Sequence, residues 1–196
     1  MNPRAHLLVF DGLADWEPAH ALCQINKSQR FEVLTVGFTK SSVTTMGGLA
    51  LTPDITLSEV DAGKTAMLIL PGGDMWQEKT HPNLIHLLHW LHKENVPIAA
   101  ICAATLEIAR AGLTHKTHHT SNSKKYLKSM VPQYADEDFY VTELAVTDKN
   151  LITASGLGSL EFGREVIKKL DIHSEADTEM WFRMFKSGTI PEKWAE

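Results

Sequence analysis

Apolar residues along this chain fall into two patterns. Longer stretches show helical spacing, and short continuous runs of apolar, β-prone residues cover 6–10, 31–38, 66–73 and 96–102. Strands that are apolar at every position are typical of a parallel sheet, because helices cover both of its faces and neither meets solvent. The pattern therefore predicts an α/β fold.

Predicted helices alternate with these strands. They cover 16–27, 81–95, 103–113, 123–131, 158–170 and 177–188. Asp15 stands where an N-cap is expected for the first helix, and Pro18 is tolerated in its first turn. Such alternation of strands and helices predicts crossover units that build a parallel sheet.

Two segments depart from this alternation. In 42–53, two short β-prone pieces flank Gly47 and Gly48, which predicts a hairpin. Later, β-prone pieces at 140–147 and 150–155 surround Asp148 and Lys149. No repeat or linker is evident, so we expect a single domain over residues 1–196. Its predicted architecture is a flavodoxin-like three-layer α/β sandwich with a mainly parallel sheet and a small added β-hairpin.

Composition narrows the class of protein. The 196 residues are 43% hydrophobic and 22% charged, with a net charge of −5, which is typical of a soluble globular protein and argues against nucleic acid or anionic membrane as a partner. No apolar stretch reaches the 18 residues that a membrane span needs. Acidic residues follow the first apolar run at once, so we expect no signal peptide. Two cysteines without a disulfide framework favour a reducing, cytoplasmic location.

Three unusual turns follow predicted strands. They are the segments "FDGLADWE" (10–17), "LPGGDMW" (70–76) and "ICAAT" (101–105). Parallel sheets of this kind bind ligands at the carboxyl ends of their strands, and the fold brings these ends to one edge. We therefore expect the functional site where the three turns meet.

Cys102 lies at the last step of the strand 96–102, where a helix begins. A residue at such an elbow exposes its side chain at the edge of the sheet, and the following helix offers N–H groups that favour thiolate. Ala103 and the glycines of 71–73 are candidate N–H donors to an oxyanion. The alternative is that Cys102 only fills space, since free cysteines are often buried. Cys23, at an apolar position within a helix, is predicted to pack.

These segments together resemble the DJ-1/PfpI (ThiJ) superfamily over nearly the whole chain. The end "EMWFRMFKSG" (179–188) also resembles a bacterial branch labelled as glutamine amidotransferases or intracellular proteases/amidases. The resemblance implies that Cys102 is the elbow nucleophile and that Glu17 is a protonated acid donating a hydrogen bond to its sulfur. It further implies that Gly72 and Gly73 form a turn that offers backbone N–H groups.

The histidine of the family is the weak point of the resemblance. Many relatives carry it about twenty residues beyond the cysteine, and this position is Asn122 here. His118 and His119 lie shortly before it and either reach the edge of the sheet or face solvent. If neither reaches Cys102, general-base activation is missing, and protease or amidase activity is in doubt. A His-x-Glu motif, as in glutamine amidotransferases, is also absent from 155–163, so we discount glutamine hydrolysis.

We expect neither a metal nor a cofactor. His86, His89 and His92 are three residues apart on one predicted helix, and each step of three turns the side chain by about 60°, so the outer two diverge. The glycine turn lacks the Lys-Ser/Thr of a phosphate-binding loop.

The sequence thus favours a cysteine-dependent enzyme acting on a small carbonyl, amide or aldehyde adduct, with His118 or His119 as possible assistants. One alternative is a redox sensor or protective protein that uses the same thiol, and another is a silent relative that serves as a binding module. The expected partners are a small-molecule substrate and, by analogy alone, a second copy in a homodimer.

Overall fold

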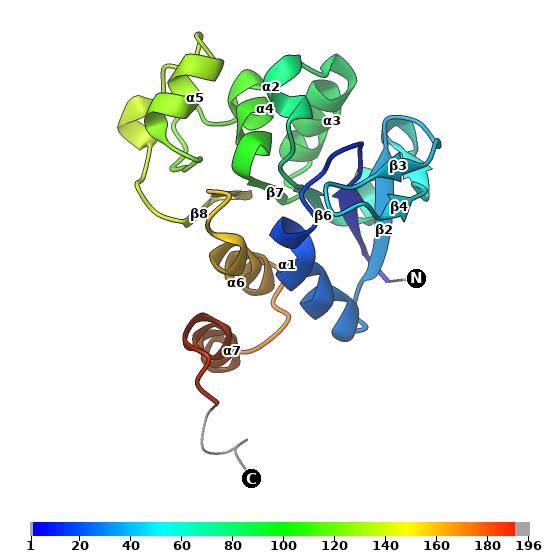
Figure 1. The fold of residues 1–196 in the computed structure, drawn as a ribbon, viewed down its shortest axis with the longest axis vertical. Coiled ribbons are helices and arrows are strands. Elements are labelled where there is room, and N and C mark those ends of the chain that lie inside the picture. Colours follow the sequence, from blue (N-terminus) through cyan, green and yellow to red (C-terminus); the bar gives the residue numbers. More distant parts are fainter. Residues whose placement is uncertain (1, 191–196) are drawn as a thin grey trace.

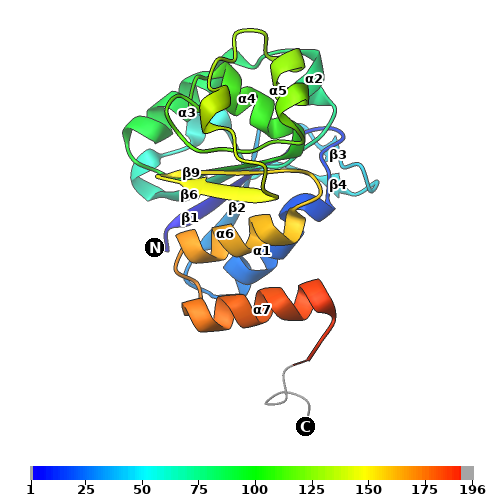
Figure 2. The ribbon, with the colours of Figure 1, turned by 90° about the vertical axis from the view of Figure 1, so that its left-hand side faces the viewer.

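A computed structural model describes residues 2–190 of the chain. A seven-stranded sheet lies between two layers of helices, and a small two-stranded sheet lies beside it (Figures 1 and 2). This confirms the predicted α/β sandwich with a mainly parallel sheet.

The strands are β1 (Arg4–Leu8), β2 (Glu32–Gly37), β3 (Val43–Thr44), β4 (Ala50–Leu51), β5 (Ile55–Thr56), β6 (Thr65–Leu70), β7 (Ile98–Ile101), β8 (Ala145–Asp148) and β9 (Leu151–Ala154). The α-helices are α1 (Trp16–Lys27), α2 (Met75–Glu78), α3 (Pro82–Lys93), α4 (Thr105–Arg110), α5 (Lys124–Met130), α6 (Ser159–Lys169) and α7 (Glu175–Ser187). Short 3-10 turns cover Leu57–Glu59, Ala62–Lys64, Cys102–Ala104 and Glu137–Phe139.

The sheet has the strand order β5-β2-β1-β6-β7-β9-β8. All neighbouring strands are parallel except β8, which pairs antiparallel with β9 at one edge. The chain moves outward from β1 to β2 and then returns to the other side of β1 with β6. This reversal is the topological switch point of a flavodoxin-like sheet, beside which such folds bind their ligands.

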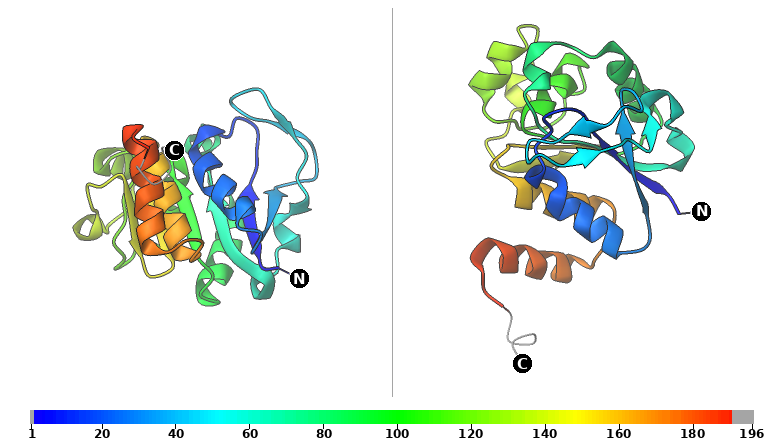
Figure 3. Two further views of the ribbon diagram at one scale, coloured as in Figure 1. Left: turned by 90° about the horizontal axis from the view of Figure 1, so that it is seen from below. Right: turned by 45° about the vertical axis from the view of Figure 1, so that its right-hand side comes forward.

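The two helical layers explain why the central strands are apolar throughout. α1 and α6 cover one face, and α2, α3, α4 and α5 cover the other, while α7 lies on the outer side of α6 (Figures 2 and 3). β7 is buried at all four positions, and β6 is buried at five of six. Both faces of these strands therefore contribute to the core, as the continuous apolar runs predicted.

The hairpin predicted in 42–53 is present. β3 and β4 pair antiparallel as a separate two-stranded sheet, and the turn between them contains Gly48 with φ 83° (Figure 3). The Thr44 carbonyl accepts a hydrogen bond from Gly12 N–H at 2.8 Å. The hairpin is thereby attached to the loop after β1, next to the carboxyl edge of the sheet.

Three local predictions need correction. Asp15 makes no side-chain cap to α1, because its carboxylate instead accepts the Gly47 N–H of the hairpin at 2.6 Å. The helix expected over 103–113 is a 3-10 turn followed by the short α4, since Cys102 itself begins the helical turn. Cys23 is exposed on α1, so the prediction that it packs in the core is wrong.

Candidate active site at the carboxyl edge of the sheet

Cys102 occupies a strained elbow between β7 and the 3-10 turn that leads into α4. Its φ of 60° lies in the left-handed region, which costs a non-glycine residue on the order of 1–3 kcal/mol. The Thr105 hydroxyl holds this turn by donating to the Cys102 carbonyl at 2.6 Å and pairing with the Ser121 hydroxyl at 2.7 Å. Ala103 and Ala104 are buried against the core, where larger side chains would not fit as easily. The backbone is thus fixed so that the sulfur stays at the edge, half-buried.

Glu17 lies in the first turn of α1 and is only 1% exposed. Its Oε2 accepts the Gly72 N–H at 2.5 Å, and its carboxyl group hydrogen bonds to the Cys102 thiol. Within residues 2–190, no lysine, arginine or histidine forms a salt bridge with it. Burial raises the pKa of Glu17, and the two hydrogen bonds only partly oppose this shift. The site therefore favours a protonated carboxyl group.

Gly72 is where the three turns come closest. A Cβ atom there would lie 2.5 Å from Glu17 Oε2 and 2.7 Å from Cys102 Cβ, so only glycine fits without a shift of the backbone. Gly73 is equally crowded on its other side, since a Cβ atom would lie 2.6 Å from the Phe10 ring. Gly73 also forms an isolated bridge with Leu13, which joins the loops after β1 and β6.

The sulfur itself has three hydrogen-bonding neighbours. Asn122 Nδ2 lies 3.3 Å from Sγ, the Ala103 backbone N–H also donates to it, and the Glu17 carboxyl is the third. Burial first, and then the negative charge of Glu17, raise the pKa of the Cys102 thiol to about 11. The N–H groups of Asn122 and Ala103 act in the opposite direction. The helical turn therefore favours the thiolate through the Ala103 N–H, but burial and the charge of Glu17 outweigh this contribution.

Burial is the main cause of both raised pKa values, and at Cys102 the charge of Glu17 adds to it. Two negative charges side by side in a partly buried site repel each other, so the Cys102–Glu17 pair retains a proton until the pH is well above neutral. A thiolate forms near neutral pH only when that proton resides on Glu17. The chemistry of the site depends on this shared proton.

Neither candidate histidine is brought to the sulfur. The His118 ring is largely exposed and faces Asp148, with Nδ1 at 3.2 Å from Oδ2. His119 is fully buried, and both its ring nitrogens are engaged, with the Thr117 carbonyl and the Tyr134 hydroxyl at 2.7 Å each. Among the described residues, no histidine hydrogen bonds to Cys102.

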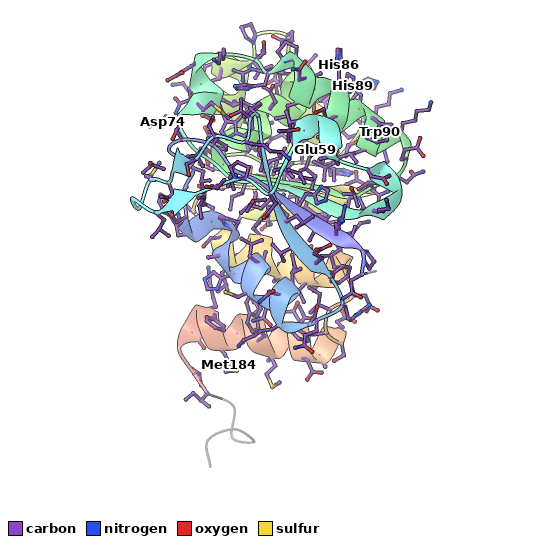
Figure 4. All side chains as sticks on the ribbon, turned by 90° about the vertical axis from the view of Figure 1, so that its right-hand side faces the viewer. Glu59, Asp74, His86, His89, Trp90 and Met184 are labelled. Atoms are coloured by element: carbon purple, nitrogen blue, oxygen red, sulfur yellow. The ribbon has the colours of Figure 1, made fainter. Side chains whose placement is uncertain are left out.

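Two neighbours of the sulfur escaped the sequence analysis. A Cβ atom at Gly156, after β9, would lie 2.8 Å from Sγ, so this loop forms a wall of the site. Tyr126 on α5 is close enough that the charges of Cys102 and Asp74, after burial, raise the pKa of its phenol. Asp74 lies on the same side of the molecule as the β3–β4 hairpin (Figure 4). The one sequence signal for Gly156 was its place after a strand whose carboxyl end reaches this edge.

The three-histidine metal site is not formed. His89 Nε2 instead pairs with the Ala111 carbonyl at 2.7 Å, and His86 lies three residues earlier on α3 (Figure 4). No group of three or more metal-ligating side chains occurs in the described part of the chain. None of the helices within residues 2–190 has the length and apolar character needed to cross a bilayer.

A second buried acid, Glu107 on α4, is satisfied in another way. Its Oε2 pairs with Arg110 at 3.1 Å, and its Oε1 accepts the His81 backbone N–H at 2.7 Å. Arg110 also donates to the Trp76 carbonyl at 2.8 Å. This cluster lies under α2 and connects α2, α3 and α4.

Comparison with known proteins agrees with this geometry. The family model described as "DJ-1/PfpI family" matches residues 3–169. The chain belongs to the DJ-1/PfpI family. The "uncharacterized protease YoaZ" of Bacillus subtilis is 38% identical over 191 residues, covering 94% of this chain and 91% of that protein.

Two solved structures of the DJ-1/PfpI type superpose closely on the chain. A ThiJ/PfpI family protein from Bacillus anthracis gives a TM-score of 0.91 at 36% identity, covering 96% of this chain and 92% of that one. A DJ-1 superfamily protein from Agrobacterium tumefaciens gives a TM-score of 0.87 at 28% identity, covering 96% and 99% respectively.

Proposed function

We propose that this DJ-1/PfpI protein is a cysteine-dependent enzyme that acts on a small carbonyl, amide or aldehyde adduct, with Cys102 as the nucleophile. The observation that carries the proposal is the contact between the Cys102 thiol and Glu17, a buried acid that forms no salt bridge within residues 2–190. A structural acid at such a position would be paired with a base, as Glu107 is with Arg110. Glu17 instead serves to hold and return a proton.

The first chemical step follows from this pair. With the proton on Glu17, the Cys102 thiolate attacks the carbonyl carbon, so that an S–C bond forms and the C=O π bond breaks. The electron pair moves to the carbonyl oxygen, which then takes the proton of the Cys102–Glu17 pair. The Ala103 N–H, which already points to the sulfur, and the backbone of Gly73 are the proposed donors to the transient oxyanion.

A second candidate function rests on the absence of a histidine among the sulfur's hydrogen-bond partners in the described chain. A redox sensor needs no general base. Its Cys102 thiolate would take one oxygen from hydrogen peroxide to give a sulfenate and water. The donors Asn122 and Ala103 would then stabilise the negative charge on the oxidised group.

The two functions are separated by one set of incubations. The protein and its Cys102→Ser variant are given methylglyoxal, glutamine or a peptide amide, and separately mild peroxide. Turnover that the substitution abolishes supports the enzyme. A gain of one or two oxygens on Cys102 without turnover supports the sensor and overturns the enzyme. If neither occurs, both proposals are wrong and a binding role remains.

The proposal includes a small-molecule substrate, a homodimer by analogy with the family, and a cytoplasmic location because two cysteines without a disulfide framework fit a reducing compartment. Light scattering on the purified protein tests the dimer, and a monomeric mass at micromolar concentration would exclude it.

A further inference from the structure

Asn122 connects the sulfur of Cys102 to the loop that follows β9. Its Nδ2 donates to Sγ at 3.3 Å, and its Oδ1 accepts the Gly156 N–H at 2.9 Å. A backbone N–H can only donate, so it must face the amide oxygen of Asn122. The Gly156 contact therefore fixes the orientation of the amide and directs its NH₂ group to the sulfur.

The surroundings of Asn122 hold it in this position. The preceding residue, Ser121, is tied to the elbow through Thr105, which also bonds to the Cys102 carbonyl. On the other side, Gly156 packs so closely that a Cβ atom would come within 2.8 Å of Sγ. The anchored backbone segments at Ser121 and Gly156 thus confine the amide group of Asn122, while the residue as a whole remains solvent-exposed.

We infer that Asn122 is a positioning residue that holds the Cys102 sulfur by donating a hydrogen bond and cannot accept its proton. The inference rests on the proposed role of Cys102 as the nucleophile. An amide nitrogen has no basic lone pair, and the amide oxygen is already occupied by Gly156. A histidine at the same place would donate to the sulfur and also exchange protons near neutral pH.

This difference determines which reactions the site supports. Hydrolysis of an amide requires a proton for the leaving nitrogen, and then a water molecule that gives its hydroxyl to the acyl carbon and its proton to a base. Glu17 lies on the buried side of the sulfur, and Asn122 takes the open side without offering a base. Addition of the thiol to an aldehyde needs only the single proton of the Cys102–Glu17 pair. Asn122 therefore favours addition over hydrolysis.

The test is the pH dependence of Cys102 alkylation by iodoacetamide, in a Cys23→Ser background so that only one thiol reacts. Asn122→Ala removes a hydrogen bond to the thiolate, and we expect alkylation near pH 8 to be about tenfold slower. Asn122→Asp replaces the donor with a negative charge, which slows alkylation further. Asn122→His adds a group that titrates, so a new limb is expected at about pH 6.5.

Asn150→Ala is the matched control, because this amide donates to the Asn95 carbonyl at 2.8 Å and has no contact with the site. Its alkylation profile is expected to equal that of the parent protein. Thermal melts followed by circular dichroism verify that each variant is folded. A parent-like profile for Asn122→Ala would overturn the inference, and so would an Asn122→Asp variant that reacts faster than the parent.

The same variants separate this inference from the proposed function. Alkylation reports on the sulfur whether or not any substrate is turned over. Loss of turnover in Cys102→Ser with unchanged alkylation in Asn122→Ala would keep the nucleophile and exclude the positioning role. In contrast, slowed alkylation without turnover of any carbonyl or amide would keep the positioning role and exclude the enzyme. Appearance of peptide-amide hydrolysis in Asn122→His alone supports the predicted choice of reaction.

Discussion

Glu17 and Glu107 are two acids of the same type, both almost completely removed from solvent, and the structure treats them differently. Glu107 pairs with the guanidinium of Arg110 and accepts the His81 backbone N–H. Glu17 has one backbone N–H, from Gly72, and the thiol of Cys102. One acid is compensated by a full positive charge, and the other is compensated by a proton.

This difference separates a structural role from a chemical one. A buried charge must be paired or neutralised, because transfer from water costs several kcal/mol. Arg110 neutralises Glu107 permanently, and the resulting cluster joins three helices. In the proposed mechanism, protonation neutralises Glu17 reversibly, so the group remains available to exchange a proton with the sulfur. Burial alone would not distinguish the two residues.

The largest predicted effect comes from breaking the ion pair between Glu107 and Arg110. Arg110→Met leaves Glu107 beside the His81 backbone N–H and the His81 ring, whose Nδ1 lies 3.6 Å from Oε1. Burial lowers the pKa of His81, so its ring does not replace the full charge of Arg110, and we expect the free energy of unfolding to fall by about 3–5 kcal/mol. Urea denaturation at neutral pH measures the loss. The control is Arg4→Met, whose partner Glu32 lies at 3.1 Å on the surface, and its cost should stay below about 1 kcal/mol. Equal losses in both variants would contradict a structural role for the Glu107 pair.

A smaller effect is expected when Gly72 is replaced. The Cβ of Gly72→Ala would press against Glu17 Oε2 and Cys102 Cβ, so the fold should lose about 1–3 kcal/mol, as overpacked sites do. Alkylation of Cys102 should change in the same variant. Gly63→Ala is the matched control, because its Cβ would meet only the Asp61 carboxylate at 3.4 Å. A Gly72→Ala protein with parent-like stability and reactivity would show that the close approach is unimportant.

Glu17→Gln tests the direction in which folding shifts the pKa of Glu17. Because its pKa is raised on folding, the folded chain binds more protons than the unfolded chain above the ordinary value of 4.5, so the contribution of Glu17 to stability falls as the pH rises. Glutamine does not titrate. Relative to the parent, the variant should therefore gain stability as the pH rises above 4.5. Parallel stability curves in urea would contradict a raised pKa.

The last prediction concerns reactivity and leaves stability aside. In the parent, the alkylation rate of Cys102 should rise in two steps as the pH increases. The first step comes when the pair has lost one proton and the remaining proton is partly on Glu17. The second comes near pH 11, where the pair loses its last proton. Glu17→Gln removes the neighbouring charge, so a single step with a midpoint below 11 is expected. Iodoacetamide kinetics from neutral to alkaline pH measure this. Identical single-step profiles in both proteins would show that the two groups are not coupled.

Much of the fold follows from the sequence for a simple reason. Continuous apolar runs such as 66–70 and 96–101 are fully buried only when helices cover both faces of the sheet. The pair Gly47-Gly48 between two β-prone pieces predicts a turn. One local error arose where a side chain found a distant partner. Asp15 is placed as an N-cap, yet its carboxylate bonds to Gly47, more than thirty residues away.

The site is predictable only in part, for the same reason. The strand-to-helix boundary indicated the elbow at Cys102, and the resemblance indicated Glu17. The amide orientation of Asn122, the wall at Gly156 and the engagement of His119 with Tyr134 depend on contacts between segments that are far apart in the sequence. The balance between burial and hydrogen bonding that raises the pKa of the thiol is likewise a property of the assembled fold.

The neighbours of the sulfur come from the first turn of α1, from the loops after β6, β7 and β9 and from the segment before α5. No single segment of the chain contains all of these neighbours, so most of the sheet must form before the last of them reaches the sulfur. Until then Cys102 is an ordinary cysteine with a pKa of about 8.5, more ionised at neutral pH than its value in the finished site allows. Completion of the fold thus places the ionisation of this thiol under the control of burial and of Glu17, and its alkylation profile is a measure of how fully the chain has matured.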